Sequence, residues 1–150
     1  MISAAVEARP RTYWQYTEIV PGLYQGGAPE PGALPFDLIV FAAVEYQPTA
    51  SAFPGSVVLH VPYEDDAEVP VQAIHTAARH ITRALRRGKR VLITCAMGLN
   101  RSGLITALVL MNLLGWSGAR AVSHVQRARF GALSNPWFTA YLTSLPARRV

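Results

Sequence analysis

Apolar and polar positions alternate in a way that predicts strands in the first half of the chain. Short β-branched or aromatic runs bounded by Gly, Pro or polar residues are typical of strands. Five such runs occur, at 13–19, 23–25, 37–42, 57–61 and 91–94. The first alternates aromatic and polar residues, which indicates an edge strand. The last three are nearly all apolar, which indicates buried, parallel strands.

Helical spacing dominates the second half. After Pro70, apolar residues recur every three or four positions up to the glycine at 88, which predicts an amphipathic helix. Its apolar set is Val71, Ile74, Ala78, Ile81 and Leu85. The almost unbroken apolar run 102–114 predicts a helix buried on all sides. Two further helices are expected at 119–129 and 135–145.

Segments rich in Gly, Pro and polar residues separate these elements. They predict loops at 26–35, with room for one helical turn, at 45–55 and at 62–69. The order of elements predicts one α/β domain over 13–150, after a loose N-terminal tail at 1–12. We expect a central, mostly parallel, twisted sheet of four to five strands, flanked by helices and covered on both faces.

Composition narrows the class of protein. The formal charge of +5 comes almost wholly from arginine, since Lys89 is the only lysine, and it favours anionic substrates. The arginines are scattered and no recognition motif accompanies them, so no nucleic-acid binding is expected. A single cysteine excludes an internal disulfide and fits the cytoplasm. No signal peptide or membrane span is expected from the sequence. A monomer is the expected state.

The loop between the last strand and the buried helix carries the candidate chemistry. A loop before a helix presents unpaired N–H groups and the positive end of the helix dipole. Gly98 permits a left-handed turn that directs several N–H groups toward one point. The sequence therefore predicts an anion-binding cradle formed by Ala96, Met97, Gly98, Leu99 and Asn100.

Cys95 and Arg101 stand at the two ends of this cradle. The helix N-terminus and the arginine favour the thiolate, which is the nucleophilic form of cysteine. The planar fork of Arg101 can hold two oxygens of a tetrahedral oxyanion. A phosphoryl group bound there would lie in line for attack by Cys95, which would give a thiophosphate intermediate. Ser102 could cap the helix, or stabilise the departing thiolate.

A general acid for the leaving oxygen is expected in the loop 62–69, the acidic loop, since it follows the end of a neighbouring strand. Its candidates are Glu64, Asp65, Asp66 and Glu68. Taken alone, this segment is better explained as a solvated surface loop, and only its place in the chain favours a catalytic role. A cysteine-based redox or sulfur-transfer protein is a second alternative, and the lack of another cysteine argues against a disulfide cycle. The histidines are dispersed, so no metal or other cofactor is expected.

Cys95 to Arg101 resembles the C-x5-R signature of the cysteine-based protein tyrosine phosphatase superfamily, and the order of elements resembles the small dual-specificity phosphatases. Segments 21–27, 61–66 and 127–138 are also similar to that family. The resemblance implies a phosphatase-like fold and phosphorylated protein or small phosphomonoester substrates. It implies Asp65, three residues after a proline, as the acid, with Asp66 as runner-up. Arg127 and Asn135 are the implied supporting residues.

One residue departs from the family pattern. Thr94, a candidate supporting residue, stands where the family has a histidine, which usually orients the loop and tunes the thiol. A phosphatase slowed by Thr94 and a phosphate-binding pseudophosphatase with little turnover therefore both remain open. The neutral loop offers no extra cation for a polyphosphorylated head group, which favours phosphotyrosine or mixed phosphotyrosine and phosphoserine/threonine substrates. Tyr46 or Phe53 could flank the pocket mouth.

Overall fold

The computed structural model describes residues 15–147. Its strands are β1 (Tyr16–Val20), β2 (Leu23–Gly26), β3 (Leu38–Ala43), β4 (Val57–Tyr63) and β5 (Val91–Thr94). Its helices are the short 3-10 turn η1 (Ala50–Ala52), α2 (Val71–Arg86), α3 (Arg101–Leu114), α4 (Gly118–Ala128) and α5 (Pro136–Thr143). The expected tail at 1–12 lies outside the described residues.

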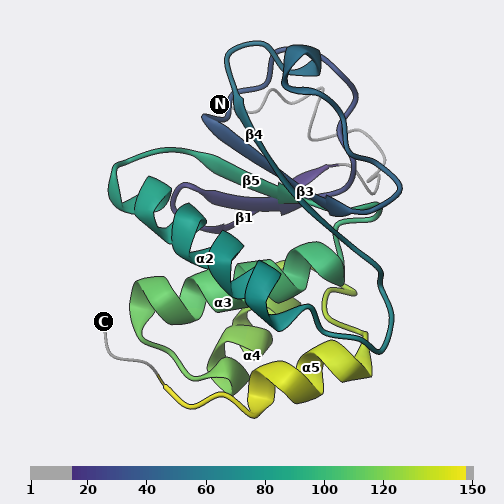
Figure 1. The fold of residues 1–150 in the computed structure, drawn as a ribbon. Helices are drawn as coiled ribbons and strands as arrows, with labels where there is room; N and C mark the ends of the chain where they lie inside the picture. The colour runs from purple at the N-terminus through teal and green to yellow at the C-terminus, as the bar shows by residue number, and fades with distance from the viewer. Residues whose placement is uncertain (1–14, 148–150) are drawn as a thin grey trace.

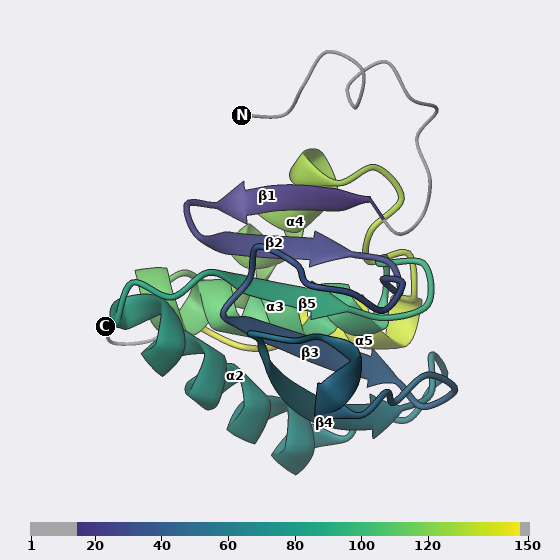
Figure 2. The same cartoon turned by 90° about the horizontal axis from the view of Figure 1, so that it is seen from above.

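The five strands form one sheet in the order β1-β2-β5-β3-β4, which Figure 2 shows from above. β1 pairs antiparallel with β2, and the other neighbours are all parallel. The predicted mostly parallel sheet is confirmed. Four strands run in the same direction: β2, β5, β3 and β4. The loops that follow their carboxyl ends therefore lie together along one side of the sheet. Two of these loops are the cysteine loop (95–100), after β5, and the acidic loop, after β4.

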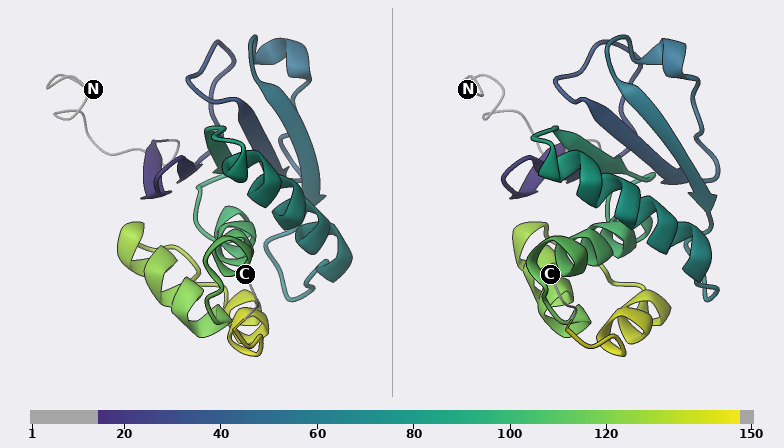
Figure 3. Two further views of the ribbon diagram at one scale, coloured as in Figure 1. Left: turned by 90° about the vertical axis from the view of Figure 1, so that its left-hand side faces the viewer. Right: turned by 60° about the vertical axis from the view of Figure 1, so that its left-hand side comes forward.

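The two faces of the sheet are covered differently. Helices α2 to α5 all lie on one face, as Figures 1 and 3 show. Leu38 and Val40 of β3 pack into this larger core, whereas the alternate residues Ile39 and Phe41 point to the other face. There they pack with Phe53, from the segment between β3 and β4, in a smaller core. The predicted helices beside the sheet are confirmed, and all four share one side.

Helix α3 occupies the centre of the larger core. Every residue from 101 to 111 is buried, which agrees with the unbroken apolar run. Helix α2 buries one face only, through Ile74, Ala78 and Ile81 of the predicted stripe, while Val71 is 47% exposed.

Two local predictions differ from the structure. Pro62 and Tyr63 continue β4 and do not begin the loop. Proline is tolerated there because β4 is an edge strand and its register with β3 is irregular between His60 and Tyr63. The helical turn expected within 26–35 is absent from that segment, and the one 3-10 turn among residues 15–147 forms at η1.

Candidate active site

Residues 95–100 connect the end of β5 to the start of α3. Gly98 adopts the predicted left-handed conformation, with φ of +73°. A Cβ atom added to Gly98 would lie only 2.3 Å from the carbonyl carbon of Gly26 at the end of β2. Both its φ angle and this close approach therefore require glycine. The contact fixes the loop against the β1–β2 hairpin.

Cys95 and Ser102 lie side by side at the base of the loop. The Cys95 Sγ is 3.2 Å from the Ser102 Oγ, and both residues are buried. Ser102 is the second residue of α3, and the N-cap position belongs to Asn100. Of the two roles expected for Ser102, its position fits a hydrogen bond to the thiolate.

Buried side chains hold the carbonyl groups of the loop from outside. The carbonyl oxygen of Gly98 accepts from Gln25 Nε2 (2.9 Å) and from Arg129 Nε (2.7 Å). Arg129 Nη2 also donates to the carbonyl oxygen of Met97 (3.2 Å). In a trans peptide the N–H points opposite to the C=O, so these bonds turn the following N–H groups toward the inside of the loop. This is the arrangement that an anion cradle requires.

Arg101 is held by groups from two other strand ends. Its Nη1 and Nη2 donate to the two carboxylate oxygens of Glu45, at 2.7 and 2.8 Å. Nη1 also donates to the carbonyl oxygen of Tyr63 (3.2 Å), and the Tyr63 hydroxyl donates to the carbonyl of Arg101. The Arg101 Nε is buried and has no hydrogen-bond partner. A bound oxyanion would satisfy this donor.

Electrostatics follow from these contacts. The hydrogen bond from Arg101 lowers the pKa of Glu45 to about 2. The same hydrogen bond raises the pKa of Arg101. Burial raises the pKa of Tyr63 well above its usual value, so its hydroxyl remains a neutral donor. The guanidinium therefore keeps its charge and its orientation.

The acidic loop separates the two candidate acids. Asp65 accepts from Asn100 Nδ2 (3.0 Å) and from Asn135 Nδ2 (2.7 Å), so its carboxylate is tied to the cysteine loop and to the start of α5. The Asp66 carboxylate accepts from the N–H of Ala67 (2.8 Å) within its own loop. The geometry therefore favours Asp65 over Asp66.

Arg127 is not brought to the site, contrary to expectation. Its side chain is exposed on α4, and Arg129 makes the contacts to the cysteine loop. The reason is the end of the helix at Ala128. Arg129 has an extended backbone (φ −133°, ψ 110°), which directs its side chain inward, while Arg127 still lies on the solvent face of the helix.

Phe53 lies elsewhere than expected, and Thr94 and Tyr46 have hydrogen-bond partners that the sequence did not reveal. The Thr94 hydroxyl donates to the carbonyl oxygen of Val40 (2.7 Å), inside the sheet, so it supports the β3–β5 pairing and not the thiol. Phe53 is fully buried in the smaller core and cannot flank a pocket. The Tyr46 hydroxyl donates to the carbonyl oxygen of Pro29, in the loop after β2.

Four residues of the site were not found from the sequence: Gln25, Glu45, Tyr63 and Arg129. Two of them carried a signal. Gln25 is a polar residue in an otherwise apolar strand, and Glu45 is the first charged residue after β3. Their partners are 73 and 56 positions away in sequence, which no local pattern reports.

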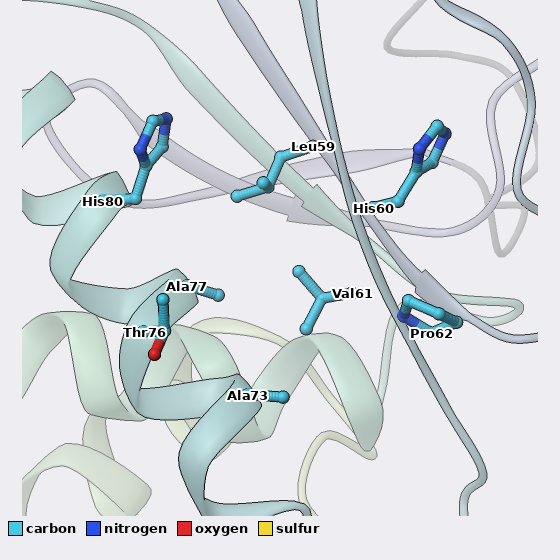
Figure 4. A pocket seen from close by; sticks show the side chains of 8 residues that line it. All are labelled: Leu59, His60, Val61, Pro62, Ala73, Thr76, Ala77 and His80. Atoms are coloured by element: carbon cyan, nitrogen blue, oxygen red, sulfur yellow. The ribbon is translucent and has the colours of Figure 1, made fainter.

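Metal sites, membrane spans and cavities also bear on the function. Within residues 15–147, no group of three His, Cys, Asp or Glu side chains could hold a metal ion, and no helix is long and apolar enough to cross a membrane. An open cavity of about 360 Å³ lies between β4 and α2, where Leu59 and Val61 face the helix (Figure 4). None of the predicted site residues lines it.

Comparison with known proteins decides the family. The family model of the dual-specificity phosphatase catalytic domain matches residues 32–146, which include the cysteine loop and the acidic loop. The chain belongs to this family. It carries the catalytic domain of dual-specificity protein phosphatases, as the C-x5-R signature indicated.

Individual phosphatases are similar to this chain in sequence and in fold. Protein phosphatase Slingshot of Drosophila melanogaster is 31% identical over 67 residues, which are 45% of this chain and 6% of that much longer protein. A mouse putative dual specificity phosphatase, solved as a complex with zinc tungstate, is similar to this chain with a TM-score of 0.78 and 29% sequence identity. The match covers 91% of this chain and 87% of the mouse chain. Human DUSP28 has a TM-score of 0.73 at 28% identity, with coverage of 86% and 90%.

Proposed function

We propose that this protein hydrolyses phosphomonoesters on phosphorylated proteins through a cysteinyl-phosphate intermediate. The observation that carries the proposal is the buried, unpartnered Nε of Arg101, in a cradle whose base is Cys95. A buried donor without a partner is costly unless a ligand satisfies it. A dianionic phosphoryl group supplies the acceptor oxygens and the charge.

Two displacements at phosphorus account for the reaction. In the first, the Cys95 thiolate forms the S–P bond while the P–O bond breaks and Asp65 gives its proton to the leaving oxygen. In the second, Asp65 accepts a proton from water, whose oxygen attacks phosphorus and expels the thiolate. The Ser102 hydroxyl, 3.2 Å from Sγ, stabilises that leaving thiolate. Free phosphate and the starting enzyme result.

The rim of the cradle supports this substrate class. Ala96 and Met97 are exposed neutral residues, and no lysine lies in the loop. A phosphotyrosine or a phosphoserine/threonine side chain on a protein suits this rim better than a polyphosphorylated head group, which would need further cations.

The alternative is a phosphate-binding protein with little turnover, and one observation favours it. The Thr94 hydroxyl is committed to Val40, so the residue before the nucleophile gives no support to the thiolate. Thr94→His tests this directly. A large gain in turnover would place the rate loss at Thr94.

The decisive experiment is hydrolysis of an aryl phosphate by the purified protein, with binding of inorganic phosphate measured by calorimetry. Cys95→Ser should abolish turnover and retain phosphate binding. Asp65→Ala should lower turnover roughly 100-fold, as loss of a general acid does, and flatten the acid-requiring limb of the pH profile. Turnover by Cys95→Ser would refute the mechanism. Phosphate binding without turnover by wild-type protein would establish the alternative.

A further inference from the structure

Asn100 occupies a helix N-cap position without capping the helix. An asparagine there usually accepts a hydrogen bond from an N–H of the first turn. The side chain of Asn100 makes no such bond, and its backbone is already helical (φ −98°, ψ −57°). Asn135, at the start of α5, behaves in the usual way and accepts from the N–H groups of Trp137 and Phe138. The Asn100 side chain is therefore used for something else.

Its polar atoms join three loops. Nδ2 donates to Asp65 Oδ2 (3.0 Å), and Oδ1 accepts from the N–H of Asn135 (2.9 Å) and from the Ser134 hydroxyl (3.3 Å). One side chain thus links the cysteine loop, the acidic loop and the segment between α4 and α5. Because it does not cap α3, it also leaves the first-turn N–H groups to an anion.

The Asp65 side chain depends on such contacts. The acidic loop is exposed from residue 64 to 68, so little packing fixes it. Each Asp65 oxygen accepts one amide donor, Oδ2 from Asn100 and Oδ1 from Asn135. Both donors belong to elements outside the acidic loop. The two amides therefore fix the direction of the carboxylate relative to the cradle.

We propose that Asn100 is a positioning residue, which holds Asp65 in register with the cysteine loop so that the acid faces the leaving oxygen. The inference rests on the proposed function, in which Asp65 is the general acid. It gives Asn100 an effect on proton transfer that is separate from phosphate binding.

Leaving-group dependence provides the test. A nitrophenyl phosphate needs little proton transfer to leave, whereas an unactivated phenyl phosphate needs much. Asn100→Ala should lower kcat for phenyl phosphate roughly tenfold, because a misplaced acid transfers its proton poorly. It should lower kcat for the nitrophenyl ester by a smaller factor, so that the ratio of the two kcat values falls roughly fivefold. A variant that misfolds would lose both activities equally, so the ratio of the two reports positioning.

Two further variants test whether Asn100 acts through Asp65. In an Asp65→Ala background, Asn100→Ala should have no additional effect on kcat for phenyl phosphate, since its partner is gone. Asn135→Ser keeps a good N-cap for α5 but removes the amide donor to Asp65, and should reproduce the selective loss. Equal losses on both esters, or additive losses in the double variant, would overturn the role of Asn100. If Asp65→Ala itself shows no leaving-group dependence, the acid assignment fails instead.

Discussion

The cysteine loop and the acidic loop lie at the same edge of the sheet but are held in opposite ways. Buried side chains from β2, β4 and the segment after α4 hold the carbonyl groups of the cysteine loop and of Arg101. The acidic loop is exposed, and its key carboxylate is held by two amide side chains. Fixed dipoles suit anion binding, because they need no reorganisation when the charge arrives.

The difference separates two properties of the site. Damage to the supports of the cysteine loop should impair phosphate binding and turnover together. Damage to the acidic loop should impair turnover alone, as expected for Asp65→Ala. Substitutions at the supports of the cysteine loop test whether phosphate binding and turnover are lost together.

Gly98→Ala should have the largest effect. The new Cβ would collide with the backbone at Gly26 and would force a left-handed conformation on alanine. We expect at least a 100-fold loss of both phosphate affinity and kcat/KM, measured by calorimetry and steady-state kinetics. Gly88→Ala is the matched control, since Gly88 has a φ of +78° but no atom within 4 Å of the added Cβ. It should cost about 1 kcal/mol of stability and leave activity intact.

Arg129→Ala should come next. It removes donors to the carbonyl groups of Gly98 and Met97, so the loop should lose its inward N–H geometry. Phosphate affinity should fall roughly tenfold, about 1.4 kcal/mol. Arg127→Ala removes the same charge from the exposed face of α4 and should leave affinity unchanged. Equal effects of the two substitutions would show that charge, and not contact, is what Arg129 supplies.

Glu45→Gln should have a smaller, pH-dependent effect on stability. The pKa of Glu45 is about 2 in the folded protein and ordinarily 4.5, so its ionised form stabilises the fold above pH 4.5. That contribution is lost as the pH falls from 4.5 through 2. The Glu45 side chain is 53% exposed, so solvent screening limits the effect to about 1 kcal/mol. Urea unfolding at pH 7 should show the variant to be less stable, and the difference should shrink as the pH falls from 4.5 toward 2.

Thr94→Val should have the smallest effect on the reaction. It removes the hydroxyl bond to the Val40 carbonyl and should lower the free energy of unfolding by about 1 kcal/mol, measured by urea denaturation. The kcat should not change, because the hydroxyl does not reach Cys95. A drop in kcat at unchanged stability would mean that Thr94 acts on the nucleophile after all.

Local patterns in the sequence predicted most of the fold and the centre of the site. The strand 91–94, the buried helix after it and the left-handed Gly98 all follow from neighbours in sequence. The supports of the site do not, because they depend on long-range packing. Arg127 and Arg129 are the same residue type two positions apart, so the local sequence does not distinguish them. Only the end of α4 at Ala128 decides which side chain turns inward. Which carbonyl the Thr94 hydroxyl meets depends likewise on the pairing of β5 with β3.

The two hydrogen bonds between Tyr63 and Arg101 restrict how far the acidic loop can move. Tyr63 is the last residue of β4, and its hydroxyl and carbonyl oxygen are both engaged by Arg101. The chain is therefore tethered, at the root of the acidic loop, to the residue that would bind phosphate. Asp65 is two residues beyond this anchor, and two residues span at most about 7 Å. The Cα atom of Asp65 therefore stays within about 7 Å of the Tyr63 Cα atom, so the acidic loop cannot carry this carboxyl group far from the cradle.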